Sequence, residues 1–330
     1  DVMFRQTMSE PQHHQPRVAA MPSQPFVVHT FDTYRWLPPL PEYSLALSAL
    51  RSPADATKVE KFVFENDRKR ALASRLMQIH MLRSSFGGIG DGDDPEVSVA
   101  RTPYGKPHLL MDGAARTALE RVGARDWTLN VSHHGRYVVG ACAADAVVGL
   151  DVTTDGLAAN PRAEETMTQF LEMFKDMFSR EEWVDVKGRG SDAGKYREFA
   201  RRWCMKESLV KAHGQGIGLD PGSICFRYGD RGGAAVSADE ADRAMEDAGG
   251  TMRAHAVPGR QADPSAWTTA VSRIDKEHCC AVTLCTMGAA VAGECDAGFA
   301  GTLSGRGDAD GDGAEAARQI RTATERLEFQ

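Results

Sequence analysis

Three short apolar runs typical of β-strands follow one another with very little chain between them. They span Trp127–Val131, Tyr137–Ala143 and Ala146–Val152, and Gly135-Arg136 marks a turn between the first two. Strands joined this closely pair antiparallel, because a parallel pair needs a crossover of a dozen or more residues. The sequence therefore predicts an α+β fold and excludes an open parallel sheet of the dinucleotide-binding type.

Segments with helical periodicity precede these strands and the later ones. Helices are predicted over Lys58–Arg83, Pro161–Phe178 and Asp192–His213, the last stopping at Gly214. Later strands are predicted over residues 224–228, 267–274 and 278–286. The order of helix followed by strands thus occurs twice along the chain.

We divide the chain into four parts. The composition predicts a flexible leader over residues 1–25 and a mobile, low-complexity tail over 288–330. The repeated order of helix and strands predicts an N-terminal α+β half over 26–148 and a C-terminal α+β half over 149–287. A Gly- and Asp-rich loop is predicted at residues 87–95, and an insertion rich in Ala, Gly and Asp at residues 231–250.

The overall composition limits the class of function. The 330 residues carry a net charge of −7, which argues against a nucleic-acid partner, because phosphate contacts need a basic surface. The seven cysteines form no C-x-x-C pair and lie mostly in apolar runs, as buried thiols do in a reducing compartment. No run approaches 18 apolar residues and no signal-peptide pattern is seen, so we expect a cytoplasmic protein that does not enter a membrane.

Two short stretches carry charges in costly positions. Asp151 follows the apolar run Ala146–Leu150, and Glu207 shares a helix face with Phe199 and Trp203, one turn before Lys211. Taken singly, Asp151 could cap a turn, and Glu207 with Lys211 could form an ordinary surface pair. Two acids and a lysine also suit a divalent cation that holds a phosphate-containing substrate.

Two further segments decide between these interpretations. Asn130-Val131-Ser132-His133 closes one strand, and Tyr104-Gly105-Lys106-Pro107 forms a turn. Together and in this order, with Gly149-Leu150-Asp151 and the helix segment Trp203–Lys211, they resemble the Sfp-type 4′-phosphopantetheinyl transferase family, and its eukaryotic members in particular. The resemblance extends from about Ser52 to Thr286.

The resemblance implies a fold of two similar α/β subdomains with pseudo-two-fold symmetry and an active site in the cleft between them. It implies Mg²⁺-dependent transfer of 4′-phosphopantetheine from coenzyme A to a serine of an apo acyl carrier, peptidyl carrier or aminoadipate-reductase carrier domain. It also implies a monomer. A catalytically inactive module that binds coenzyme A or a carrier protein is the alternative, and a different Mg²⁺-dependent nucleotide transferase is a further one.

The resemblance also assigns roles to individual residues. Asp151 and Glu207 would ligate Mg²⁺, Glu207 would act as general base and Lys211 would neutralise the pyrophosphate. The residues that would contact coenzyme A are Lys58, Arg101, Lys106, Pro107, Ser132, His133 and Lys211.

One position departs from the pattern of many bacterial members. They have Asp-x-Glu where this chain has Asp151-Val152-Thr153. The site would therefore have two protein carboxylates and no third acid.

Overall fold

The structure of the protein is a computed structural model. It describes residues 26–50, 52–86, 97–102, 105–111, 113–121, 123–156, 166–214, 219–229, 235–246, 251–257 and 267–286. The leader over 1–25, the loop at 87–95 and the tail over 288–330 lie outside these residues.

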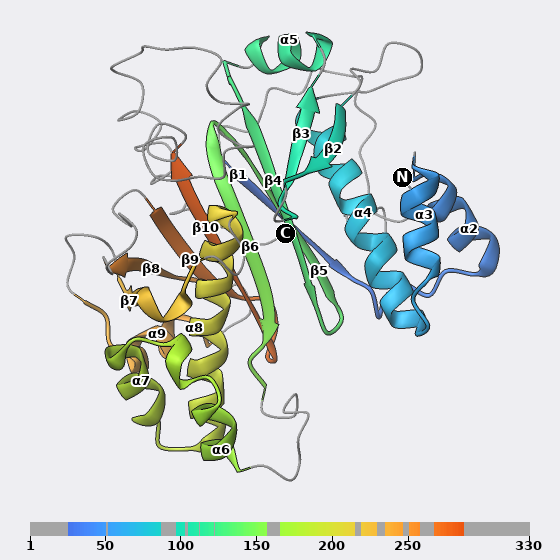
Figure 1. Ribbon diagram of the computed structural model, residues 1–330. Helices are drawn as coiled ribbons and strands as arrows, with labels where there is room; N and C mark the ends of the chain where they lie inside the picture. Colours follow the sequence, from blue (N-terminus) through green and yellow to red (C-terminus); the bar gives the residue numbers. More distant parts are fainter. Residues whose placement is uncertain are drawn as a thin grey trace.

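The chain folds into α-helices and antiparallel strands, as predicted (Figure 1). The first part contains β1 (Phe26–Asp32), α2 (Leu40–Ser48), α3 (Pro53–Glu60), α4 (Glu65–Phe86), β2 (Val97–Arg101), β3 (Pro107–Met111), α5 (Gly113–Arg121), β4 (Trp127–His134) and β5 (Tyr137–Ala144). The second contains β6 (Ala146–Thr154), α6 (Met167–Glu172), η2 (Lys175–Met177), α7 (Arg180–Lys187), α8 (Asp192–His213), η4 (Pro221–Ser223), β7 (Cys225–Tyr228), α9 (Ala238–Ala244), β8 (Thr251–Val257), β9 (Trp267–Arg273) and β10 (His278–Thr286).

The two parts repeat one order of elements, although β2 and β3 form a separate two-stranded sheet in the first part, whereas all strands of the second part form one five-stranded sheet. In the first, β1 is followed by the 22-residue helix α4 and by the hairpins β2–β3 and β4–β5, and β1 pairs with β5. In the second, β6 is followed by the 22-residue helix α8 and by β7–β8 and β9–β10, and β6 pairs with β10. This repetition confirms the prediction of two similar α+β halves. The residue boundaries predicted for them remain a prediction.

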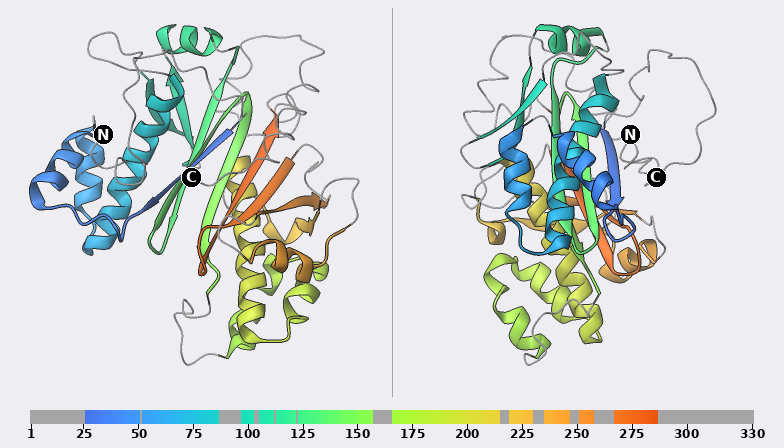
Figure 2. Two further views of the ribbon diagram at one scale, coloured as in Figure 1. Left: turned by 180° about the vertical axis from the view of Figure 1, so that it is seen from behind. Right: turned by 90° about the vertical axis from the view of Figure 1, so that its right-hand side faces the viewer.

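Apolar side chains hold together the layers of helices and sheets that Figure 2 shows. Helix α4 packs on the first sheet through Leu72 and Met77, which contact the cluster that includes Val138. Helix α8 covers the second sheet in the same way. Between the sheets, alternate residues of β5, β6 and β10 form a third cluster, as expected when both faces of a strand are buried.

The tightest contact between elements joins β6 to α8 at Gly149. A Cβ atom placed on Gly149 would lie 2.1 Å from the backbone oxygen of Ser208 and 2.3 Å from the backbone nitrogen of Ala212. No side chain fits there, so glycine permits strand and helix backbones to approach. Because side chains alternate along a strand, Asp151 projects from the same face of β6. The contact therefore directs Asp151 toward α8.

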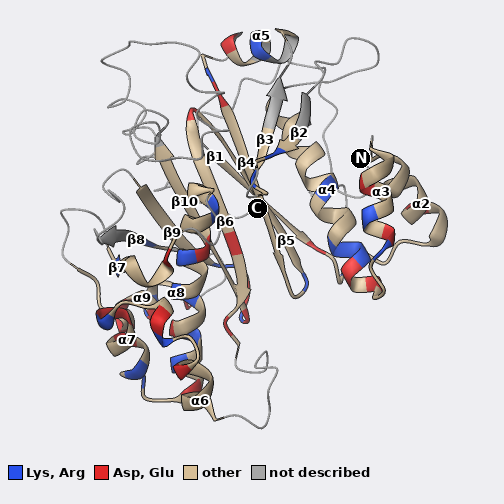
Figure 3. Cartoon of the chain, viewed as in Figure 1, with Lys and Arg blue, Asp and Glu red and all other residues tan. Residues whose placement is uncertain are grey.

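Buried ion pairs fix α8 against its neighbours. Figure 3 shows that α7 and α8 carry both acidic and basic positions. Arg189 pairs with the buried Glu198 at 2.8 Å, and Lys206 pairs with the buried Glu182 of α7 at 2.8 Å. Removing one partner of such a pair costs about 3–5 kcal/mol, so these charges hold the helix in one position. The sequence interpretation did not foresee them.

Several predicted elements agree with the structure. The helix over Asp192–His213 is α8, and Gly214 caps it in the left-handed region with φ 83°. The strands predicted after Trp127 are β4, β5 and β6, and the turn at Gly135-Arg136 is present. Two strands run further than predicted, however. Strand β4 continues to His134 and β6 to Thr154, so Ser132, His133 and Asp151 lie within strands and not at their ends.

The predicted helix over Lys58–Arg83 is wrong as one element. Helix α3 ends at Glu60, and α4 begins at Glu65. The intervening Phe62-Val63-Phe64 is aromatic and β-branched, and such residues lose side-chain freedom in a helix. The hydrophobic periodicity was correct for α4 alone.

The predicted helix through Phe178 is also wrong. The part before residue 166 lies outside the described residues, and α6 ends at Glu172. Phe178 is extended, and Ser179 begins α7 with a capping box to Glu182. Such a cap satisfies free backbone donors and starts a new helix. The described part of the predicted insertion contains α9, which begins with a capping box of the same kind at Ser237.

The described helices do not include one with the length and apolar character that a membrane crossing requires.

We predict that Gly149→Ala lowers the free energy of unfolding by about 2 kcal/mol, because overpacking forces the backbones of β6 and α8 apart. Urea denaturation measures this loss. Gly190→Ala is the matched control, since a Cβ there would meet nothing within 4 Å. Equal stability of the two variants would show that the close approach at Gly149 is not a constraint.

Candidate active site

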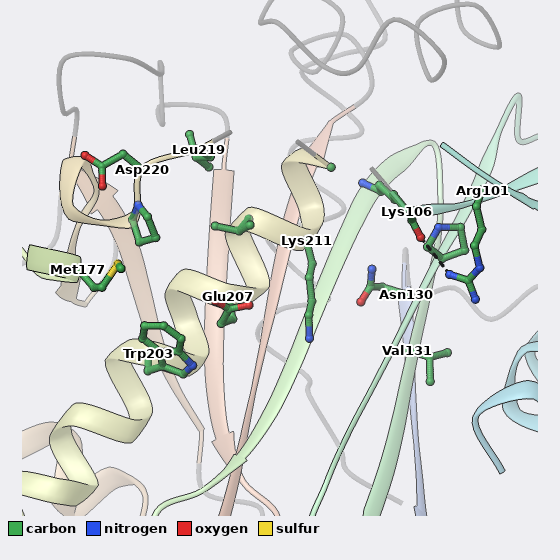
Figure 4. Close-up of a pocket in the computed structure, with 15 residues that line it drawn as sticks. Arg101, Lys106, Asn130, Val131, Met177, Trp203, Glu207, Lys211, Leu219 and Asp220 are labelled. Atoms are coloured by element: carbon green, nitrogen blue, oxygen red, sulfur yellow. Dashed lines mark hydrogen bonds between the residues drawn. The ribbon is translucent and has the colours of Figure 1, made fainter. Parts of the chain in front are cut away.

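A cavity lies where the two halves meet (Figure 4). Its volume is about 770 Å³. It is lined by Arg101, Gly105, Lys106, Pro107, Asn130 and Val131 from the first half and by Met177, Trp203, Glu207, Val210, Lys211, Gly214, Leu219, Asp220 and Pro221 from the second. The volume is in the range of small-molecule sites, and neither half forms the wall alone.

Hydrogen bonds join the halves beside this cavity. Thr128 Oγ1 of β4 donates to the carbonyl oxygen of Ala146 on β6 at 2.6 Å. Further along the same strands, Ser132 Oγ donates to Asp151 Oδ1 at 2.8 Å. Strands β4 and β6 thus run side by side, and Ser132 from one half meets Asp151 from the other.

Lys211 completes this contact from α8. Its Nζ donates to Ser132 Oγ at 2.9 Å and forms an ion pair with Asp151. Figure 4 shows the Lys211 side chain extending from the helix toward the side of β4. Asp151 and Lys211, predicted as site residues from separate segments, are in direct contact.

Glu207 lies one turn before Lys211 and faces the cavity together with Trp203 and Val210. Its carboxylate accepts no hydrogen bond from the described residues. Burial and the negative charge of Asp151 raise the pKa of Glu207, and the positive charge of Lys211 opposes this. The two carboxylates are therefore close enough to interact electrostatically.

The basic end of the cavity is formed by the turn before β3. Gly105 has φ 86°, and Arg101 Nη1 donates to its carbonyl oxygen at 2.9 Å. The adjoining residues 103–104 lie outside the described part. The Lys106 side chain is buried, and its Nζ donates to the carbonyl oxygen of Ala212 near the end of α8. The cations Arg101 and Lys106 thus lie at the opposite side of the cavity from Trp203 (Figure 4).

Four predicted residues lie outside the cavity wall: Asp151 and Ser132, which contact Lys211 of that wall, and His133 and Lys58. His133 is an exposed residue of β4, but nearby protein atoms partly desolvate its ring, and this together with the charges of Arg70 and Lys211 lowers its pKa. Lys58 is in the last turn of α3, where its Nζ pairs with Asp55 at 3.4 Å. The structure does not bring Lys58 to the other site residues.

The loop at residues 219–221 closes the cavity and was not predicted. Lys206 Nζ donates to the carbonyl oxygen of Pro221 at 2.9 Å, which ties this loop to α8. The signal in the sequence was Asp220-Pro221-Gly222, a turn pattern. Nothing in it indicates a distant partner.

The donor set fits a single hard cation. In the described part of the chain, no cluster of three or more His, Cys, Asp or Glu side chains is arranged to hold a metal ion. Glu207 supplies one carboxylate in the cavity wall, and Asp151, in contact with Lys211 of that wall, supplies a second. Mg²⁺ commonly takes one or two protein carboxylates together with phosphate oxygens and water. Thr153, two residues beyond Asp151 on the same face of β6, adds no charge.

Family comparisons match most of the chain. The model described as "4′-phosphopantetheinyl transferase, N-terminal" matches residues 34–145, and that of the 4′-phosphopantetheinyl transferase superfamily matches residues 148–283. The boundary between the two matches falls at the start of β6, where the repeated order of elements begins again.

Individual relatives are more distant. The mouse L-aminoadipate-semialdehyde dehydrogenase-phosphopantetheinyl transferase is 28% identical over 204 residues, which cover 62% of this chain and 61% of the mouse protein. The 4′-phosphopantetheinyl transferase Sfp of Bacillus subtilis is 27% identical over 186 residues, 56% of this chain and 70% of that protein. The solved holo-ACP-synthase of Plasmodium yoelii is 16% identical with a TM-score of 0.28, covering 36% of this chain and 91% of its own.

We predict a pH-dependent gain in stability for Glu207→Gln. The raised pKa means that ionising Glu207 is harder in the folded protein than in the unfolded chain, where the ordinary value is 4.5. This cost is absent below pH 4.5 and develops as the pH rises above it. Thermal unfolding with a chelator present should show the variant more stable than the wild type at pH 7, and equal to it near pH 4. A gain that does not change with pH would contradict this, and Glu120→Gln, at an exposed position on α5, is the control.

Proposed function

The chain belongs to the 4′-phosphopantetheinyl transferase superfamily, and on that premise we propose that it transfers 4′-phosphopantetheine from coenzyme A to apo carrier proteins. The carrier serine oxygen forms a bond to the β-phosphorus of coenzyme A, and the bond from that phosphorus to the bridging oxygen breaks. The products are the holo carrier protein and adenosine 3′,5′-bisphosphate.

One observation carries the proposal. Asp151 on β6 contacts Lys211 and Ser132 beside a cavity that both halves line, and Glu207 on α8 faces that cavity one turn before Lys211. One side of the site has the two carboxylates and Lys211, and the other side of the cavity has Arg101 and Lys106. This arrangement suits a negatively charged diphosphate substrate bound with a metal ion. The chain covers 61% of the length of the mouse relative, so its activity and partners are inferred for this segment.

Asp151 and Glu207 are proposed to hold Mg²⁺, which would neutralise the pyrophosphate when bound. Glu207 is also proposed to accept the proton of the carrier serine, directly or through a water. A raised pKa suits this role, because a general base is most effective when its pKa lies nearer the working pH. Lys211 is proposed to neutralise pyrophosphate oxygens as a compact point charge.

The remaining contacts to coenzyme A follow from position. Lys106, Arg101 and Pro107 would bind the end of the coenzyme that bears the 3′-phosphate. Ser132 would bind phosphate with its hydroxyl, and His133, neutral at pH 7 because its pKa is lowered, would act as a hydrogen-bonding group and not as a cation. Lys58 stays a prediction from the resemblance.

The carrier partner is proposed as an acyl carrier, peptidyl carrier or aminoadipate-reductase carrier domain. Exposed apolar side chains are the natural contact for a protein partner. Near the cavity these are Met173 and Met177, whereas Phe174 and Phe178 pack into the core beside α8. We propose a cytoplasmic monomer.

Incubation with coenzyme A, Mg²⁺ and a panel of apo carrier proteins tests the function. Mass spectrometry should show the phosphopantetheine mass added to at least one carrier. Binding of coenzyme A or of a carrier without any added mass would support the inactive module instead. Turnover of a nucleotide without a carrier would support a different transferase.

We predict that Glu207→Gln lowers kcat by about 100-fold or more, because the variant lacks the proposed base. The dissociation constant for coenzyme A, measured by calorimetry, should stay within about threefold, since an amide of the same shape leaves the cavity intact. Glu120→Gln should transfer at the wild-type rate. Full activity of Glu207→Gln would refute the assignment of the base.

We predict that Thr153→Glu changes metal dependence. A third carboxylate on the face of Asp151 adds a charge to the donor set, which alters selectivity between cations. The ratio of transfer rates with Mg²⁺ and Mn²⁺ should differ from that of the wild type. Thr153→Gln, of similar size but neutral, should keep the wild-type ratio, and an unchanged ratio in the Glu variant would contradict the proposal.

A further inference from the structure

The ammonium group of Lys211 lies against the Asp151 carboxylate, where a bound Mg²⁺ would also have to lie. Its ammonium group pairs with Asp151 Oδ1. The same oxygen accepts the hydrogen bond from Ser132 Oγ, and Ser132 Oγ in turn accepts from Lys211. The three groups therefore form a closed ring of contacts across the two halves.

Lys211 is the member of this ring that lines the cavity. The Asp151 side chain is 11% exposed and that of Lys211 is 32% exposed. Lys211 and Glu207 line the cavity, whereas Asp151 and Ser132 are not part of its wall. A cation arriving through the cavity meets the Lys211 side chain before it meets Asp151.

The charges explain why the ring is stable. A buried carboxylate without a partner costs several kcal/mol, and Lys211 removes that cost for Asp151. Lys211 thus compensates Asp151 in the protein without substrate, as a bound cation would.

We propose that Lys211 is an internal counter-ion that closes the metal site until the diphosphate of coenzyme A draws its ammonium group away. This inference rests on the proposed function and deepens it by assigning an order of binding. The flexible four-carbon stem of lysine permits such a movement. Lys211 must leave Asp151 before that carboxylate can ligate a cation, so the protein without coenzyme binds divalent cations weakly.

Mn²⁺ binding to the protein without coenzyme A tests the proposal. Electron spin resonance separates free from bound Mn²⁺ and requires no turnover. Lys211→Met should bind Mn²⁺ at least about tenfold more tightly than the wild type, a difference of about 1.4 kcal/mol. Lys211→Gln serves as a second variant, and circular dichroism checks that each is folded.

Two matched controls test whether Lys211 weakens Mn²⁺ binding by pairing with Asp151 or only by adding a positive charge to the cavity. Lys211→Arg keeps a cation on Asp151 and should bind Mn²⁺ as weakly as the wild type. Lys106→Met removes one positive charge from the same cavity, from a lysine whose Nζ donates to Ala212. Its Mn²⁺ affinity should stay within about threefold of the wild type, because partly screened charges that do not touch the site contribute little.

Equal Mn²⁺ affinities for Lys211→Met and the wild type would overturn the proposal, as would an equal gain in Lys106→Met. Transfer by the wild-type protein to an apo carrier is measured separately. Its absence would remove the proposed function, whereas normal transfer with equal Mn²⁺ affinities would remove only the role of Lys211 as counter-ion.

Discussion

The close approach of β6 to α8 at Gly149 is the contact on which the site depends. No side chain separates the backbones of β6 and α8 at Gly149. The residue two positions after Gly149 on the strand therefore meets the helix residue that lies one turn after Ser208. Those residues are Asp151 and Lys211, with Glu207 one turn earlier on the helix. Burying a charge costs free energy, and here Asp151 and Lys211 offset that cost by pairing with each other. Glu207 instead faces the cavity.

The second requirement is the repeated fold. Each half supplies one long helix packed on an antiparallel sheet, and the halves are joined where β4 runs beside β6. Ser132 from one half and Asp151 from the other meet at that junction. A single half would carry only some of the site, which explains why a chain of this kind contains both. The buried ion pairs of α8 add rigidity at Glu198, in the first part of the helix, and at Lys206, next to Glu207.

The sequence was informative where local signals agree with the tertiary fold. Helix α8 has a clear start, periodicity and a glycine cap, and β4 to β6 have apolar runs with a turn between the first two, so these elements were predicted closely. The helix through Phe178 failed because its apolar stripe fits a continuous helix equally well, and only the cap at Ser179 shows that a new helix begins. Strand β1 was missed, since its pairing with β5 joins residues more than 100 positions apart.

The site residues were found through motifs, but their contacts were not. No pattern indicates that Ser132 bonds to Asp151, because this contact depends on how the halves meet. None indicates that Lys206 donates to Pro221, because this contact depends on how residues 219–221 pack on α8. A crystal structure with coenzyme A and Mn²⁺, recorded for anomalous scattering, tests the account most directly. We expect one manganese peak within ligand distance of both Asp151 and Glu207, with Lys211 Nζ moved from Asp151 to the diphosphate. A peak elsewhere, or Lys211 still paired with Asp151 in the complex, would contradict it.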